Sequence, residues 1–341
     1  IRDVAVTGVQ TCALPISIYS DESTKDYNHY IKFLINLTSI KAELHCHNSF
    51  SNYHVGENDA PFDCDITISQ QLERAHTLGL DALFVTNHNT LDGYSQLLQY
   101  KNDHAKYKHI QIFQAEEITT DTGAHVIGYG IHKEIRAGLT LDEILDQIRD
   151  QDGISCAPHP FSLLDALRNQ AAKCDLIEVF NSNNVDVISN ARATEFSLEH
   201  NKIGVAGSDS HVLSTLGRCT NVIESENSLD AAIHAMRHNK IKIHQTGYAK
   251  EQETLEHIKY KINNSQDYLA EYIRENYPNS QWMMSLLLKI YNLNQNSYVW
   301  SLVYKLAVFL MKRVSSKINI HGYDPSKLHD RNLATMLRMA I

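Results

Sequence analysis

The sequence predicts an α/β protein in which a βα barrel is followed by an α-helical C-terminal region. Two features of the pattern lead to this prediction. Strand-sized apolar runs alternate with helical patterns between residues 41 and 245, and this order is typical of βα units with a mainly parallel sheet. After about Thr246 only helical patterns remain. With 43% apolar and 21% charged residues, the 341-residue chain contains enough apolar side chains for a buried core, which excludes a disordered or fibrous protein.

Seven apolar runs have the length of strands, and most of them end in polar residues. They are 42–47, 81–88, 110–117, 124–130, 153–160, 175–181 and 202–209. Helical patterns lie between them at 67–78, 91–107, 140–150 and 185–200. The active site of a βα barrel is built from the carboxyl ends of its strands and the loops that follow. The polar residues that end these runs are therefore the first candidates for function.

The first 40 residues are set apart from the predicted barrel. Residues 1–16 contain the run V-T-G-V-Q-T-C-A-L-P-I, which looks like one reading frame of a sequencing-adapter oligonucleotide, so we exclude them from the fold. Residues 17–40 are expected to form a helical lead-in. The six cysteines include no C-x-x-C pair, and the start of the chain has no secretory leader pattern, so a cytoplasmic location is expected.

The helical region 246–341 differs from the rest of the chain in charge. It carries 12 Lys and Arg against 8 Asp and Glu, a net charge of +4 in a chain whose total is −9. No carboxylate lies between Asn276 and Tyr323, and the runs 282–293 and 298–311 are strongly apolar. Each run is shorter than the about 20 residues that span a bilayer. We expect a buried helical hairpin, packed on the barrel or across a homodimer; the alternatives are contact with an anionic membrane surface or with a nucleic-acid strand.

Histidine is abundant, with 19 residues beside 31 Lys and Arg. His45 and His47 flank Cys46 at the end of the first run, where the alternation of a strand sends both imidazoles to one face. An H-x-H motif alone is a weak signal, but six strand ends carry His, Asp or Glu. These residues are His45, His47, His88, Glu116, Glu117, His125, His159, Glu178, Asp209 and His211. Burying such groups costs free energy unless they are paired or bind a metal, so the pattern indicates a metal site.

Taken in order, these motifs resemble those of the PHP family, which is named for its polymerase and histidinol phosphatase members. The matching motifs are H-C-H at 45–47, T-N-H-N at 86–89, A-E-E-I-T-T at 115–120 with the later His125, A-P-H-P at 157–160 and G-S-D-S-H at 207–211. The resemblance covers residues 41–245. It implies a distorted (β/α)7 barrel that holds two or three divalent ions and usually hydrolyses phosphoesters.

The resemblance also implies which residues bind the first two ions. A first ion would be held by His45, His47, Glu117 and Asp209. A second would be held by Glu117, His125 and His159, so Glu117 would bridge the two ions. Mixed imidazole and carboxylate ligands suit Mn, Fe and Zn, and the sequence does not distinguish these metals.

The third ion of the family would be bound by His88, His211 and an acidic residue soon after the H-x-H motif. That position is Asn52 in this chain, with His54 two residues later as a further candidate ligand. The family also usually has Asp where this chain has Asn87. Both departures remove negative charge near the third ion, so the expected number of ions is two or three.

Other candidate residues would assist the reaction. His88 or His211 would pass a proton to the leaving group. Arg192 and Arg218 would grip a substrate phosphate in a bidentate fork. A final group is expected to orient the ligands from behind: Asn52, Asn87, Glu178 and Asn181.

The leading functional hypothesis is a metal-dependent phosphoesterase that hydrolyses a phosphomonoester of a small molecule or nucleotide. Paired divalent ions suit this reaction, because they lower the pKa of bound water and neutralise charge as the leaving oxygen departs. One alternative is a nuclease that trims the 5′ ends of oligonucleotides, with help from the basic C-terminal region. Another is a metal-binding scaffold without catalysis, since fold alone does not establish activity.

Overall fold

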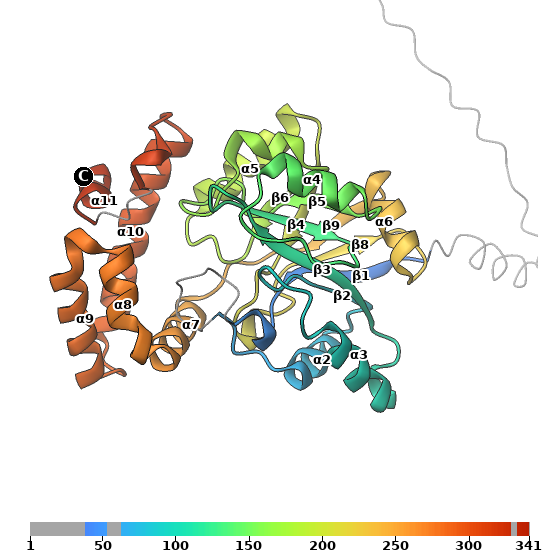
Figure 1. The fold of residues 1–341 in the computed structure, drawn as a ribbon, viewed down its shortest axis with the longest axis horizontal. Helices are drawn as coiled ribbons and strands as arrows, with labels where there is room; N and C mark the ends of the chain where they lie inside the picture. The colour runs from blue at the N-terminus through green and yellow to red at the C-terminus, as the bar shows by residue number, and fades with distance from the viewer. Residues whose placement is uncertain (1–37, 53–62, 329–332, 341) are drawn as a thin grey trace, which may run out of the picture. The chain divides into compact units, whose positions relative to one another are not determined.

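Figure 1 shows the computed structural model, which describes residues 38–52, 63–328 and 333–340. The predictions for 1–16 and 17–37, and the candidate ligand His54, lie outside the described residues. The first strand begins at Ile40, which was predicted as the last residue of the helical lead-in.

A nine-stranded sheet forms the framework of the barrel (Figure 1). Its strands are β1 (Ile40–Cys46), β2 (Ala82–Val85), β3 (Gln111–Thr119), β4 (His125–Tyr129), β5 (Ile154–Ala157), β6 (Leu176–Asn181), β7 (Ile203–Gly207), β8 (Thr220–Ile223) and β9 (Ile241–Gln245). Their order in the sheet is β7-β6-β5-β4-β3-β2-β1-β8-β9. All seven predicted strands are present. The sequence did not reveal β8 and β9, because only two of the four residues of β8 are apolar and β9 is mostly exposed and lacks an apolar run.

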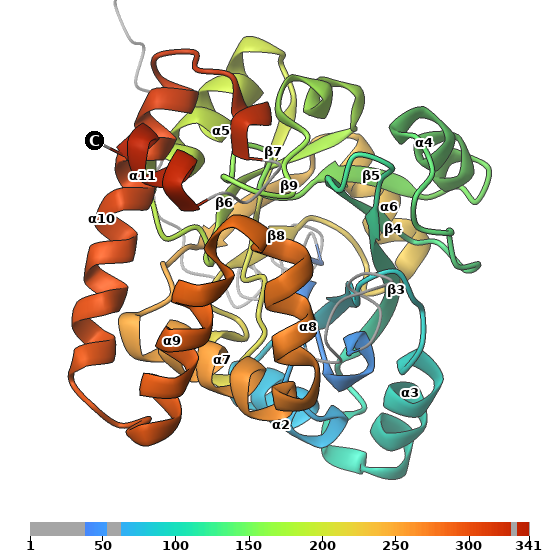
Figure 2. The same ribbon diagram turned by 60° about the vertical axis from the view of Figure 1, so that its left-hand side comes forward.

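In the described ranges, five helices pack around the sheet (Figure 2). They are α2 (Ile68–Thr77), α3 (Tyr94–Asp103), α4 (Leu141–Arg149), α5 (Val187–Glu199) and α6 (Leu229–Arg237). Helices α2 and α3 share an apolar core with β1–β3, and α4 and α5 share another with β3–β6. Thr67 and Thr140 each begin a helix with a capping box that satisfies free backbone N–H groups, which explains why α2 and α4 start where predicted.

The sheet is mixed, which corrects the prediction of a mainly parallel one. Strand β4 runs antiparallel to both β3 and β5, and β8 runs antiparallel to both β1 and β9. Only five residues, 120–124, connect β3 to β4. A parallel crossover needs a dozen or more residues, so this connection forces a hairpin.

Hydrogen bonds bring the two halves of the sheet together between β7 and β8. The Asn221 side chain on β8 accepts from the Ala206 N–H at 3.0 Å and donates to the Ala206 carbonyl at 2.7 Å. Residues beyond the end of β7 also pair with β1, because the Asp209 N–H donates to the His45 carbonyl at 2.7 Å. The sheet therefore curves into a nearly closed barrel, and the ends of β1 and β7 lie side by side.

The C-terminal region is helical, as expected. It contains α7 (Glu251–Asn264), α8 (Gln266–Asn276), α9 (Gln281–Leu293), α10 (Val299–Asn319) and α11 (Leu333–Ala340). Helix α10 is tied to the barrel at its C-terminal end, where Ser315 donates a hydrogen bond to Asp186 at 2.7 Å and Asn319 donates to the Phe161 carbonyl at 3.0 Å.

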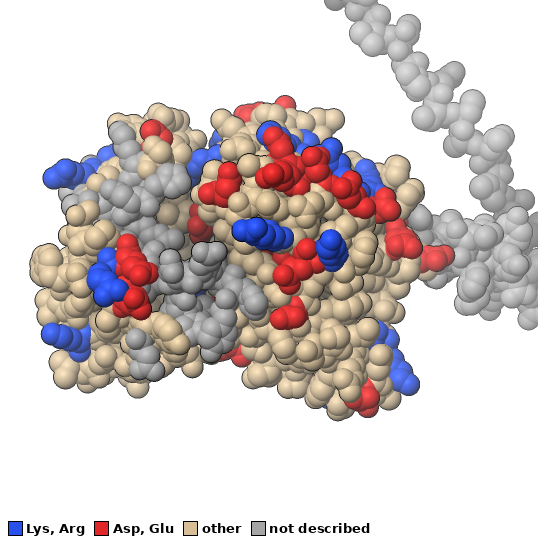
Figure 3. Space-filling view, in the orientation of Figure 1, with Lys and Arg blue, Asp and Glu red and all other residues tan. Residues whose placement is uncertain are grey.

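The expected buried hairpin is not formed within one chain. Trp282 on α9 is 73% exposed and Leu302 on α10 is 66% exposed, because only the C-terminal end of α10 packs on the barrel. Burial across a homodimer and contact with a membrane surface remain predictions. None of the helices in the described part of the chain has the length and apolar character needed to cross a membrane. On the face shown in Figure 3, acidic side chains gather over the barrel and are fewer over α8–α11.

Replacing Asn221 with Ala is expected to destabilise the barrel by about 2 kcal/mol or more. The change would leave the buried Ala206 N–H and carbonyl without partners, and an unsatisfied buried polar group costs about 1–3 kcal/mol. The measurement is the free energy of unfolding in urea. Lys242→Ala on the neighbouring strand serves as control, because its side chain is 76% exposed. Equal stability of the two variants would contradict the proposed closure.

Candidate metal centre

The ends of β1, β3 and β7 bring the candidate residues together, as the pattern predicts. His45 and His47 both face Glu117, on β3, and Asp209, just beyond β7. Cys46 points to the other face and packs with the apolar residues beneath α2 and α3. The alternation expected for H-C-H is therefore observed.

Four of these side chains form one tight cluster. The Nε2 atom of His45 lies 3.1 Å from Glu117 Oε2 and 3.5 Å from Asp209 Oδ1. The Nε2 atom of His47 lies 3.3 Å and 3.4 Å from the same two oxygens. The four ligand atoms lie within 4.8 Å of one another, and the four residues are those that the sequence assigned to a first ion.

Glu117 uses its other oxygen for a second group. Oε1 lies 2.9 Å from His125 Nδ1 and 3.1 Å from His159 Nε2, the two residues assigned with it to a second ion. His88 also approaches, with Nδ1 3.5 Å from Glu117 Oε2. His88, Glu117 and His125 form a compact ligand group, with His159 beside it.

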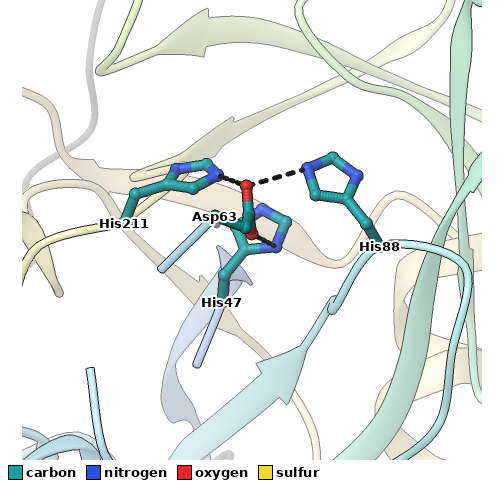
Figure 4. Close-up of side chains that lie close together, drawn as sticks. All are labelled: His47, Asp63, His88 and His211. Atoms are coloured by element: carbon teal, nitrogen blue, oxygen red, sulfur yellow. Dashed lines mark ion pairs between the residues drawn. The ribbon is translucent and has the colours of Figure 1, made fainter. Parts of the chain in front are cut away.

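A third cluster contains an acidic residue that the sequence interpretation missed. Asp63 lies among His47, His88 and His211, and Figure 4 shows their rings surrounding its carboxylate. Asp63 Oδ1 is 3.1 Å from His211 Nε2 and 3.8 Å from His88 Nε2, and Oδ2 is 3.9 Å from His47 Nδ1. In the sequence, the acidic pair Asp63 and Asp65 before α2 was the signal that could have indicated this ligand. The pair lies well beyond position 52, where the acidic ligand was expected.

Asn52 and Asn87 support loops and are not members of these clusters. Asn52 Oδ1 accepts hydrogen bonds from the Asp63 and Cys64 N–H groups, at 2.5 and 3.1 Å. Asn52 thereby holds the chain segment that carries Asp63. Asn87 donates from Nδ2 to Asn48 and accepts from the Asn48 N–H at 2.9 Å, which joins the loops after β1 and β2. An aspartate at position 87 would lose the donor that this pairing needs.

Glu178 and Asn181 hydrogen-bond to members of the clusters. Glu178 lies 2.9 Å from His45 Nδ1 and accepts from the His159 N–H at 2.7 Å. A proton on His45 Nδ1 leaves the Nε2 lone pair directed at Glu117 and Asp209. Asn181 donates to both Glu178 and Asp209, at 2.8 and 3.1 Å. Gly207 leaves room for this arrangement, because a Cβ atom there would collide with Glu178 and His45.

Two candidate ligands occupy a backbone conformation that L-residues rarely adopt. His159 has φ of 30° and Asp209 has φ of 49°, and each lies two residues beyond the end of its strand, β5 or β7. Such backbone costs about 1–3 kcal/mol and persists where surrounding contacts enforce it. The N–H groups of both residues donate short hydrogen bonds, to Glu178 and to the His45 carbonyl, each at 2.7 Å. The strain directs both side chains into the site.

The buried charges of the site influence one another strongly. Burial opposes charge on Glu117, but the surrounding imidazoles outweigh it and hold the pKa of this carboxyl well below its usual range. Burial likewise opposes charge on His47, yet Asp209 and Glu117 raise its pKa to about 9. For His88 burial dominates and lowers the pKa to about 3. The Glu117 carboxyl is thus ionised, and positive charge close to it, from imidazoles or from bound cations, balances its charge.

Unsatisfied atoms in the clusters fit a bound metal. Both ring nitrogens of His47, Nδ1 of His88 and Oδ2 of Asp63 are buried and have no hydrogen-bond partner among the residues that the structure describes. Buried polar atoms without partners are uncommon and call for an explanation such as an ion. Imidazole nitrogens with carboxylate oxygens are a donor set suited to Mn, Fe and Zn. The buried clusters therefore fit a polynuclear metal site.

Several members of the clusters line a pocket of about 360 Å³, among them Asp63, Glu117 and Asp209. Helix α7 contributes two lining residues, His257 and Lys261, which the sequence patterns did not single out. His257 donates to the Asp63 carbonyl at 2.7 Å, and its ring stacks on that of His211 with centroids 4.8 Å apart. His257 thus contacts the loop that carries Asp63, although it lies more than 190 positions further along the chain. Local sequence patterns do not reveal such a contact.

The two candidate phosphate-binding arginines are not among the described residues that line this pocket. Arg192 lies on α5, where its guanidinium donates to Glu199 at 2.9 and 3.1 Å and stacks over the Phe161 and Phe196 rings. Arg218 pairs with Glu253 at the start of α7. Both arginines tie elements of the structure together, and Lys261 is the basic residue that reaches the pocket.

Changing Asp63 to Asn is expected to lower the metal content by about one ion per chain, because the third cluster would lose its only carboxylate. Elemental mass spectrometry on protein purified without chelator measures this. Asp65→Asn is the matched control, since Asp65 lies two residues away and outside the clusters. Unchanged metal content in Asp63→Asn would exclude Asp63 as a ligand.

Comparison with known proteins supports the resemblance. Residues 187–240 match the family model described as PHP-associated. An uncharacterized protein of Methanocaldococcus jannaschii is 29% identical over 156 residues, which are 44% of this chain and 87% of that protein. A second uncharacterized protein of this organism is 32% identical over 128 residues, which are 34% of this chain and 53% of that protein.

A solved structure, the lesion-specific endonuclease Q of Pyrococcus furiosus, aligns with a TM-score of 0.45 and 18% identity over 60% of this chain and 58% of that chain. Similarity of this extent does not indicate a substrate. The His, Asp and Glu motifs at the strand ends, the barrel that brings them together and the PHP-associated segment at 187–240 make the chain similar to the PHP family.

Proposed function

We propose that the chain is a metal-dependent phosphoesterase that hydrolyses a phosphomonoester of a small molecule or nucleotide. The observation that carries the proposal is the sharing of ligands between clusters. Glu117 belongs to two clusters, and His47 and His88 each belong to two. Shared ligands hold cations close together, as a reaction on a phosphate requires.

Each part of the site has a role in this reaction. When bound, paired divalent ions lower the pKa of water and offset the charge of the attacking and leaving oxygens. The residues of the chain hold and orient these ions, and Lys261 adds a positive charge beside them. His88 and His211 both line the pocket; His211 is the better candidate for passing a proton to the leaving oxygen, because burial holds the pKa of His88 far below neutral. His211 Nδ1 donates to the Asp209 carbonyl at 2.9 Å. The other ring nitrogen, Nε2, lies 3.1 Å from Asp63 Oδ1.

The charge of the pocket favours a small phosphomonoester over an oligonucleotide. A nucleic-acid strand is usually held by a groove with several basic side chains. Among the described residues that line the pocket, Lys261 is the single Lys or Arg. One cation beside a metal site suits one phosphate group. The completeness of the clusters likewise favours an enzyme over a scaffold that has lost catalysis.

Replacing Glu117 with Gln is expected to reduce phosphate release from p-nitrophenyl phosphate and nucleoside monophosphates by more than about 100-fold. Loss of a residue that merely supports a metal ligand typically lowers metal affinity or activity by roughly 10–100-fold. Glu117 is itself a member of two clusters, so a larger loss of activity is expected. Steady-state phosphate release with added Mn²⁺ or Zn²⁺ is the measurement.

Glu116→Gln is the matched control. Glu116 is buried on the other face of β3, where it accepts from the Ile135 N–H at 3.0 Å, and burial raises its pKa to about 8. Glutamine therefore replaces a carboxyl that is already neutral at pH 7, and activity is expected to stay close to that of the wild type. An active Glu117→Gln variant would refute the proposal.

A further inference from the structure

A second cavity, of about 380 Å³, lies within the helical C-terminal region. Helices α7, α8, α9 and α10 form its walls together with Val185 from the barrel. Of the 18 residues that line it, only Thr254 and Lys259 are neither apolar nor aromatic. Small-molecule sites are typically cavities of about 300–1,000 Å³ with mainly apolar walls and a few polar groups, and this cavity has that character.

The apolar cavity adjoins the metal-centre pocket. Val185 and Met311 line both. Helix α7 also serves both, because Ile258 and Ile262 line the apolar cavity while His257 lines the metal-centre pocket. One molecule could therefore occupy both cavities at once, with a charged end at the metals and an apolar end among the helices.

A buried hydroxyl in the apolar cavity lacks a partner. Tyr291 is 5% exposed and lines the cavity, and its hydroxyl has no hydrogen-bond partner among the described residues. A buried hydroxyl without a partner costs free energy, so a ligand with an oxygen atom near this point would restore a missing hydrogen bond. The cavity thus offers apolar walls together with one site for a polar group of the ligand.

We propose that the substrate is an amphiphilic phosphate ester whose phosphate binds in the metal-centre pocket and whose apolar chain lies in the helical cavity. This inference rests on the proposed phosphoesterase function and specifies its substrate class. The adjacency of the two cavities, which share Val185 and Met311 in their walls, supports it, as does their contrast in character: ionisable groups surround one, and aliphatic and aromatic side chains surround the other.

Binding is tested first, with a readout that does not need hydrolysis. The chain has two tryptophans; Trp300 lines the apolar cavity, whereas Trp282 is 73% exposed and does not. In a Trp282→Phe background, Trp300 alone reports on the cavity. Titration with octanol or octyl phosphate below the micelle concentration is expected to give a saturable blue shift of its fluorescence. Ethyl phosphate is expected to give none.

Turnover is tested second, with ethyl, butyl, hexyl and octyl phosphate. The value of kcat/KM is expected to rise about threefold to fourfold per added methylene until the cavity is filled, as burial of apolar surface predicts. Ala307→Phe, which adds a ring at the cavity wall, is expected to abolish this rise. Leu306→Phe is the matched control. The Leu306 side chain is 58% exposed and does not line the cavity, so this variant is expected to preserve the rise.

The outcomes separate this inference from the function on which it rests. A Trp300 shift without hydrolysis of any phosphomonoester would refute the phosphoesterase and keep the cavity as a site for apolar chains. Hydrolysis that does not depend on chain length, with no Trp300 shift, would overturn the inference and keep the phosphoesterase. An unresponsive Trp300 in a chain that sediments as a dimer would also overturn it, in favour of a second copy covering the cavity.

Discussion

The site is organised around the buried carboxylate of Glu117. Its two oxygens lie close to five imidazoles, which belong to His45, His47, His88, His125 and His159. A carboxylate with this little access to water is tolerable only when positive charge surrounds it. The strand ends, the strained backbone after β5 and β7 and the hydrogen bonds of Glu178 all serve to hold those imidazoles in place. The barrel can therefore be understood as the frame that fixes this one set of charges.

Helix α7 joins the barrel to the helical C-terminal region. Its Tyr260 hydroxyl donates to the Cys64 carbonyl at 3.0 Å, and His257 donates to the Asp63 carbonyl. The loop that carries Asp63 is thus held by contacts from both parts of the chain. The same helix lines the apolar cavity, so the helical region both forms part of the wall of the metal-centre pocket and provides the surface on which a substrate chain would rest.

Much of the fold and of the site was predictable from local pattern. The H-C-H motif placed His45 and His47 on one face, since alternation in a strand leaves no other arrangement, and the short connection after β3 required a hairpin that we had not foreseen. Asn52 and Asn87 could not be assigned in this way. Their amides hold loops, and only the partners of an amide reveal whether it replaces a ligand or supports one.

The sequence by itself determined the kinds of ligand and the strand ends that present them, because strand periodicity and residue chemistry are local properties. Tertiary structure alone decided that Asp63 belongs to the third cluster, that Arg192 and Arg218 bind carboxylates of their own chain, and that a charged pocket and an apolar one meet at Val185 and Met311. These are contacts between residues far apart in the chain. They depend on how helices and loops pack on the barrel, and no periodicity in the sequence records that packing.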